Sequence, residues 1–355
     1  MNKYIASIYD ISDWEVWSHL QTGGSRNKKI VKNPEDQKPY YFKTSLLKGE
    51  RYYKYEFWSE IIVSKLGSYL GFNLLDYNIG ITDNTIGCIS KSMLSDLEQH
   101  ELIEGRQYLA GTNGLYDPND KKCYKMYTFQ FIEKALKTYN IPYIMDGLLK
   151  AIVFDCIIGN SDRHQDNWSI ICFKINHPLM SRDDSNIIRK NLNARISTIF
   201  EKVKLILKLL FTKKCKIRHY NMIMKKIKGE FAPIYDSGCC LVREYEDDAL
   251  DNLDIDKYIA RGVSEIRWEA RDNKKVPHFE LLKLIKEYDR RYSRIVNQEI
   301  KRVLKIYNKE EVKNIVYNID QNLDKEVFRD YILPDNRKKI ICEIIDRRIE
   351  KMKSI

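Results

Sequence analysis

The chain of 355 residues is 43% hydrophobic and 31% charged, which is typical of a globular protein with a substantial buried core. No apolar run is long enough to span a bilayer, and acids at 10, 13 and 15 interrupt any secretory signal, so the sequence argues against integral membrane and secreted classes. The net charge of +11 comes from residues 174–230, which contain fifteen Lys or Arg and four Asp or Glu. The rest of the chain is neutral, so the basic character belongs to this one segment.

Residues 1–94 are predicted to form a small, mainly β unit. A turn-rich loop at 22–29 precedes a short apolar strand, and its candidate phosphate-contacting residues are Gly23, Gly24 and Ser25. Backbone amides in such a loop can cover phosphate groups. A plain hairpin turn explains the same composition nearly as well, because no G-x-G-x-x-G pattern is present.

An apolar strand at 40–44 carries Lys43, and an amphipathic helix is predicted over 53–70. A strand lysine usually points to solvent. If it instead binds phosphate, it needs an acidic partner on the next helix. Glu60 is the first candidate for that partner, and Glu56, one turn earlier, is the second.

A β-hairpin is predicted from strands at 77–81 and 86–90. The second strand runs on to Lys91 and Met93, and the resemblance to a kinase family given below implies that this is a hinge between two lobes, where backbone groups would meet an adenine ring. The following residues, 96–126, are polar and glycine-containing and are predicted to be loop insertions.

Helices are predicted over 127–139 and 144–158, and the second leads into the sequence Gly-Asn-Ser-Asp-Arg-His-Gln-Asp-Asn-Trp at 159–168. Asp162 and Asn167 are five positions apart, which is the spacing of a kinase catalytic loop. That chemistry needs a carboxylate at the attacking hydroxyl and an amide oxygen at a magnesium ion. A turn or helix cap is the ordinary explanation of such residues, but here they lie between two apolar elements.

A second acidic element follows at 232–238, where Asp236 ends an apolar run and precedes Ser237 and Gly238. A metal-binding Asp is expected at such a position. The combination of this element with the 159–168 loop is far more specific than either part alone.

The basic segment at 174–230 separates these two elements and is predicted to be an insertion with a helix at 196–211. Three roles stay open for it: packing on the body, contact with an anionic membrane surface, and binding to nucleic acid or another acidic partner. Residues 257–355 are predicted to be all-α, with a break at Pro334.

The two acidic elements resemble the N-x-D-x-H-x-x-N and D-x-G motifs of HipA-like serine/threonine kinases. With Arg163 before the histidine and Trp168 after the asparagine, the pattern is most similar to the compact, stand-alone CtkA-like form. The resemblance implies an α+β, bilobal, protein-kinase-like fold. Its small mainly-β N-lobe with one helix would span 1–94, and its large mainly-α C-lobe would span 95–355.

The resemblance also implies ATP and Mg²⁺ as cofactors and a role for each candidate residue. Asp162 would orient the acceptor hydroxyl, Asn167 and Asp236 would hold magnesium, and Lys43, fixed by Glu60, would neutralise phosphate charge.

Two further residues of the loop keep alternative roles. His164 would either contact the γ-phosphate or brace the loop, whereas Arg163 is expected to be structural. Asp166 is a weaker rival of Asn167 as a metal ligand, because the five-residue spacing selects Asn167.

The expected function is therefore transfer of the γ-phosphoryl group of ATP to a serine or threonine of a protein, with autophosphorylation at Thr22 or Ser25. A phosphatidylinositol-type lipid or small-molecule kinase, which shares the D-R-H-x-x-N core, and a nucleotide-binding pseudokinase stay open as alternatives. The resemblance suggests an antitoxin or a host protein as partner. Eight cysteines without a C-x-x-C pair fit a reducing cytoplasm, with delivery to a host cell as a further option.

Overall fold

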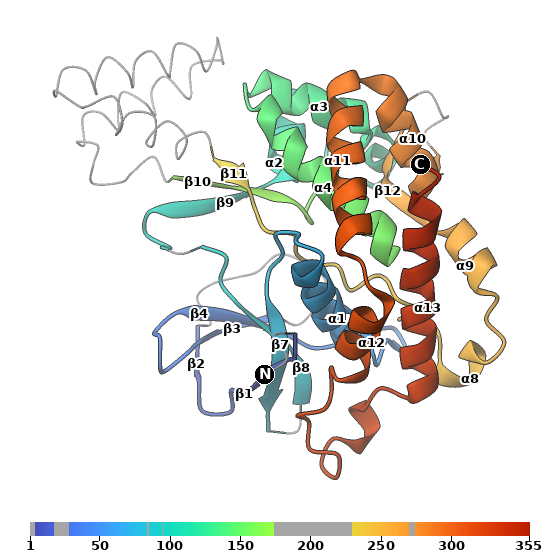
Figure 1. Cartoon of the computed structure of the whole chain (residues 1–355). Helices are drawn as coiled ribbons and strands as arrows, with labels where there is room; N and C mark the ends of the chain where they lie inside the picture. The colour runs from blue at the N-terminus through green and yellow to red at the C-terminus, as the bar shows by residue number, and fades with distance from the viewer. Residues whose placement is uncertain (1–3, 18–27, 84, 95, 174–228, 270–273) are drawn as a thin grey trace.

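The computed structural model describes residues 4–17, 28–83, 85–94, 96–173, 229–269 and 274–355 (Figure 1). The predicted phosphate loop at Gly23, Gly24 and Ser25, the hydroxyl of Thr22, and the basic insertion up to residue 228 lie outside the described residues.

A six-stranded sheet forms the N-terminal part of the described chain, in the order β1-β7-β8-β4-β3-β2. Its strands are β1 (Ile8–Asp10), β2 (Glu15–Val16), β3 (Lys28–Lys32), β4 (Pro39–Lys43), β7 (Tyr77–Thr82) and β8 (Thr85–Lys91). β1 runs parallel to β7, and the other neighbouring strands are antiparallel. A separate short hairpin consists of β5 (Leu47–Lys48) and β6 (Arg51–Tyr52).

Helix α1 (Glu56–Tyr69) packs against β7 and β8 on one side and against α12 on the other (Figure 1). It is therefore buried from Glu56 to Gly67, although its sequence predicted a solvent-facing side. Its polar residues need partners because a buried charge without one is costly. The Lys65 amine, for example, donates to the Asp76 carboxylate at 2.6 Å and to the Asn78 side chain at 2.9 Å.

The C-terminal part is mainly helical, with α4 (Met145–Ile158) at its centre. The other helices are α2 (Gly105–Thr112), α3 (Phe129–Thr138), α8 (Asp247–Leu250), α9 (Ile255–Arg261), α10 (His278–Tyr288), α11 (Arg290–Ile306), α12 (Lys309–Tyr317) and α13 (Asp335–Met352). α4 is apolar on nearly every side because it packs against α10, α11 and α13. This burial explains the continuous apolar run in its sequence.

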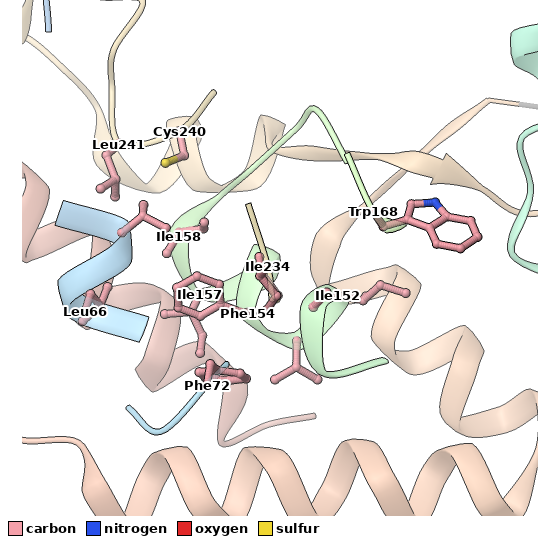
Figure 2. Close-up of a cluster of buried hydrophobic side chains, with 14 of the residues drawn as sticks. Leu66, Phe72, Ile152, Phe154, Ile157, Ile158, Trp168, Ile234, Cys240 and Leu241 are labelled. Atoms are coloured by element: carbon pink, nitrogen blue, oxygen red, sulfur yellow. The ribbon is translucent and has the colours of Figure 1, made fainter. Parts of the chain in front are cut away.

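The core joins the two parts of the molecule. Figure 2 shows Leu66 of α1, Phe72, and Phe154 and Ile157 of α4 in one cluster with Ile234, which lies within the second acidic element. The rings of Phe72 and Phe154 have centroids 4.8 Å apart. Apolar packing therefore fixes α1, α4 and the 234–241 segment relative to one another.

Two sequence predictions about secondary structure were wrong. Residues 96–126 are not a loop insertion, because they contain β9 (His100–Glu104) and α2. β9 pairs with β10 (Ser169–Phe173), which also pairs with β11 (Glu230–Phe231), so the strand depends on partners far away in the chain. Gly105, at the start of α2, makes room for an aromatic ring: a Cβ there would lie 2.2 Å from the Trp168 side chain.

The C-terminal region is likewise not all-α. A hairpin of β12 (Val263–Arg267) and β13 (Lys275–Pro277) precedes α10. Helix α13 begins at Asp335, directly after the predicted break at Pro334. Among the described helices, none has a stretch both apolar and long enough to cross a bilayer.

Candidate active site

Lys43 lies at the end of β4 and is in contact with two carboxylates. Its amine is paired with Glu60 of α1 and donates to the Asp236 carboxylate at 2.8 Å. Lys43 is only 6% exposed. Burial works to lower the pKa of Lys43, but the charges of Asp236 and Glu60 outweigh it and hold that pKa well above its ordinary value. The lysine is therefore charged and held in one position.

The two glutamates of α1 have different partners. Glu60 contacts Lys43 through one oxygen and accepts a 2.9 Å hydrogen bond from the Ser237 amide through the other. Glu56 instead pairs with Arg243 at 2.6 Å and accepts from the Leu46 amide at 2.9 Å. Glu60, the first candidate, is thus the glutamate beside Lys43.

The loop after α4 begins at Gly159, which ends the helix in the left-handed conformation with φ of 73°. The loop then folds on itself: the Asn167 side-chain amide donates to the Asp162 carbonyl at 2.7 Å, and the Asn167 backbone amide donates to the His164 carbonyl at 3.0 Å. The five-residue spacing thus closes a tight turn. With its nitrogen used in this way, the amide oxygen of Asn167 is left as a candidate ligand.

Arg163 braces this loop from inside the protein. Its guanidinium, 1% exposed, pairs with Asp155 of α4 through two hydrogen bonds of 2.9 and 2.8 Å. It also donates to the carbonyls of Asn167 and Tyr235, both at 2.7 Å, and to the Ser237 hydroxyl at 2.8 Å. Arg163 therefore ties α4, the 159–168 loop and the segment around Asp236 together.

Asp162 and His164 lie at the accessible side of the loop. The Asp162 carboxylate is 3.2 Å from the Cys239 thiol and 4.0 Å from the His164 ring, and its side chain is 39% exposed. The other ring nitrogen of His164 lies 3.4 Å from Asp166. Burial acts to lower the pKa of His164, but the hydrogen bond with Asp166 and the charges of Asp162, Asp166 and Asp236 raise it above its ordinary value.

Asp236 is held beside this loop in a left-handed backbone conformation with φ of 51°. Asp tolerates this conformation better than most residues, and such backbone geometry is common at functional sites. Tyr235 on one side and Ser237 on the other are both bonded to Arg163. The structure therefore brings Asp162, Asn167 and Asp236 together, with Lys43 facing them.

Lys28 is a candidate that the sequence analysis missed. It is paired with Lys43 in the β3–β4 register, so both amines are on the same face of the sheet, and its amine lies 3.8 Å from the second oxygen of Asp236. Two lysines directly opposite each other repel, unless an anion lies between them. Lys28 had no motif to identify it, because its position depends on strand register.

If the site binds ATP, as expected from the sequence, Lys28→Met should raise the KM for ATP about tenfold, which corresponds to losing one hydrogen bond to a charged group. The matched control is Lys29→Met, because Lys29 is the next residue on the same strand and points to the opposite, exposed face. Steady-state kinetics at varied ATP would check this, and equal KM values for the two variants would contradict it.

Lys91 and Met93 are the other predicted nucleotide contacts within the described residues. The Lys91 side chain is exposed and paired with Asp36 at 2.5 Å, so it does not point toward Lys43. Met93 follows β8 and is half-buried, in a connection where the Ser92 amide donates to the Pro39 carbonyl at 2.9 Å. Adenine recognition by backbone groups here stays a prediction.

The residues fit a magnesium–nucleotide complex rather than a free metal ion. Within the described ranges, no group of three or more His, Cys, Asp or Glu side chains could hold a metal. Mg²⁺ is commonly bound by one or two protein oxygens, with phosphates and waters completing its shell. Asp236 and Asn167 could provide one carboxylate and one amide oxygen to such a complex, and Lys28 and Lys43 could provide cations for phosphate.

Comparison with solved structures decides the fold. The crystal structure of the Helicobacter pylori proinflammatory kinase CtkA matches with a TM-score of 0.63 and 16% identity, covering 98% of each chain. The chain has the fold of CtkA. The HipA chain of the Shewanella oneidensis MR-1 HipA–HipB–operator DNA complex matches with a TM-score of 0.49 and 12% identity, over 95% of this chain and 67% of that one. No protein-family model and no curated protein matches.

The CtkA-like kinase fold confirms the predicted α+β class, with an N-terminal sheet and one helix followed by a mainly helical part. In this fold the Lys43–Glu60 pair lies in the N-terminal part, and the 159–168 loop lies in the C-terminal part, with Asp236 between them.

Proposed function

We propose that this chain is an ATP-dependent protein kinase that transfers the γ-phosphoryl group to a serine or threonine hydroxyl. The observation that carries the proposal is the contact of one buried amine, that of Lys43, with both Glu60 and Asp236. Lysine, helix glutamate and metal-binding aspartate are the parts that kinases must bring into register for transfer.

Each residue has a role that follows from its surroundings. Asp162, the most accessible carboxylate of the loop, accepts the hydrogen bond of the acceptor hydroxyl and takes its proton. Lys43, kept charged by its two carboxylates, and Lys28 stabilise negative charge on phosphate. Arg163 holds the loop and the Asp236 segment at a fixed separation.

Asn167 and Asp236 would hold Mg²⁺, and Lys43 and Lys28 would hold the phosphates of ATP. When bound, ATP would supply the phosphoryl group and Mg²⁺ would neutralise its charge. Asn167 is preferred to Asp166 as the ligand, because the Asp166 carboxylate faces Arg106 at 3.2 Å and His164 at 3.4 Å.

The test is transfer of label from γ-labelled ATP, in the presence of Mg²⁺, to the protein itself and to a general protein acceptor. Wild type should label both, and Asp236→Asn should reduce labelling to background. Equal labelling by the two would overturn the proposal. Nucleotide binding without transfer to any acceptor would favour a pseudokinase, and transfer only to phosphatidylinositol vesicles would favour a lipid kinase.

A further inference from the structure

A cavity of about 380 Å³ lies against the start of the 159–168 loop, at Gly159 and Ser161. It is lined by the loop, the segment after Asp236, the α9–β12 connection and α13. Its lining residues are Tyr53, Gly159, Ser161, Cys239, Arg243, Glu244, Tyr245, Tyr258, Arg261, Gly262, Val263 and Arg348. Three arginines against one glutamate make the lining positive.

Arg348 of α13 is the most unusual of these residues. It is 1% exposed, and one of its nitrogens donates to the Cys156 carbonyl near the end of α4 at 2.9 Å. Its Nε atom is buried without a hydrogen-bond partner, and no carboxylate among the described residues forms an ion pair with it. Burial lowers the pKa of Arg348, so the guanidinium is held there at a cost in free energy.

Two glycines without side chains leave the space that the Arg348 guanidinium occupies. A Cβ on Gly159 would lie 2.9 Å from the guanidinium carbon, and a Cβ on Gly262 would lie 2.5 Å from one of its terminal nitrogens. Both glycines line the cavity. Any larger residue at either position would collide with the Arg348 head group.

His278 adds a second unsatisfied polar group next to Gly262. It is 3% exposed, and its Nε2 lies 2.8 Å from the Asn160 carbonyl, so this nitrogen carries the proton and donates. Burial, and then the charge of Arg348, lower the pKa of His278 to about 3, so the ring is neutral. Its Nδ1 has no partner. His278 is not one of the residues that line the cavity, and because its ring is neutral it leaves the charge of Arg348 uncompensated.

The other two arginines differ in their availability. Arg243 is paired with Glu56, whereas Arg261 at the end of α9 is exposed at the cavity. Arg261 and Arg348 together exceed the charge of Glu244, and tyrosine side chains complete the lining. Guanidinium groups pair with phosphate through parallel hydrogen bonds, which makes a phosphate monoester a better fit than a neutral ligand.

We infer that this cavity binds a phosphorylated side chain of the protein acceptor, such as phosphoserine, and so selects acceptors that already carry phosphate near the reacting hydroxyl. This rests on the proposed kinase function. The cavity is adjacent to the acceptor side of the site, because Ser161 precedes Asp162 and Cys239 contacts the Asp162 carboxylate at 3.2 Å. A group held there is next to Asp162, and Lys43 is not among the lining residues.

Binding is tested first, on the full chain, with inorganic phosphate and with a serine peptide in phosphorylated and unphosphorylated forms. The phosphorylated peptide and phosphate should raise the melting temperature, on the order of 2 °C at tenfold excess over Kd, whether or not Mg-ADP is present. Arg261→Gln and Arg348→Gln should weaken this binding about ten- to hundredfold. Arg347→Gln is the matched control, since Arg347 is the adjacent exposed residue of α13, paired with Asp256 and Glu343.

Arg348→Gln could destabilise the fold because Arg348 is buried. Arg261 is exposed, so Arg261→Gln should fold normally and any loss of binding in it can be assigned to the cavity. No response to phosphate, or an equal response in Arg261→Gln and wild type, would overturn the inference and leave a water-filled cavity. Binding to phosphoinositide vesicles but not to the phosphopeptide would overturn the inference that the cavity binds a phosphorylated protein side chain.

Selection is tested next by transfer of label to the two peptides. Wild type should have at least tenfold higher kcat/KM for the phosphorylated peptide, and Arg261→Gln should lose this preference while still labelling the unphosphorylated one. Equal kcat/KM in wild type would overturn the inference while the kinase function stands. Loss of all transfer, with phosphate binding intact, would instead overturn the kinase function.

Discussion

Asp162→Asn is expected to lower the rate of phosphoryl transfer by about 10²- to 10⁴-fold, the range associated with losing a positioned general base. The amide has the shape of the carboxylate but does not take a proton from the acceptor hydroxyl. Single-turnover transfer from labelled ATP measures this rate separately from nucleotide binding. Because Asp162 is 39% exposed and its carboxylate is close to the Cys239 thiol and His164, the variant should fold and bind nucleotide normally.

Asp166→Asn is the matched control for this experiment, since Asp166 is on the same loop and also contacts His164. Its carboxylate is turned toward Arg106, so its loss should reduce transfer less than tenfold. A nearly normal rate in Asp162→Asn together with an inactive Asp166→Asn would transfer the catalytic role to Asp166.

Asp155→Ala is expected to destabilise the protein by about 3–5 kcal/mol, because it leaves the Arg163 guanidinium buried without its counter-charge. Burial works to lower the pKa of Arg163, but the charge and hydrogen bonds of Asp155 outweigh this and raise it. Asp155 also accepts a 2.9 Å hydrogen bond from the Asn160 side chain. Urea unfolding followed by circular dichroism gives the change in free energy of unfolding.

The matched control is Asp146→Ala, which removes an aspartate from the same helix, α4. Asp146 pairs with Arg291 at 2.7 Å, but both side chains are about half exposed, so its loss should cost at most about 1 kcal/mol. If the two variants differed by less than about 1 kcal/mol, the Asp155–Arg163 pair would not be the brace described above.

The acidic segment at 244–256 finds partners on a helix far along the chain. In the structure Arg337 and Arg347 of α13 pair with Asp247 and Asp256, and Asn336 donates to Asp251 at 2.6 Å. The segment therefore already packs on a described helix.

Features that depend on neighbours in the chain could be predicted from the sequence. The Asp162–Asn167 turn closes within five residues, and apolar periodicity located α1, α4 and the β7–β8 hairpin to within a few positions. These features are local, because they arise from the spacing of side chains along a short stretch of chain.

Contacts between groups that are distant in the chain became known only from the folded structure. The choice of Glu60 rather than Glu56 beside Lys43, and the position of Lys28, depend on helix packing and strand register. β9 exists because β10 pairs with it, and the Arg348 cavity exists because α13 returns to the end of α4 some 190 residues later. Such contacts arise from long-range packing, which leaves no fixed spacing in the sequence to be recognised.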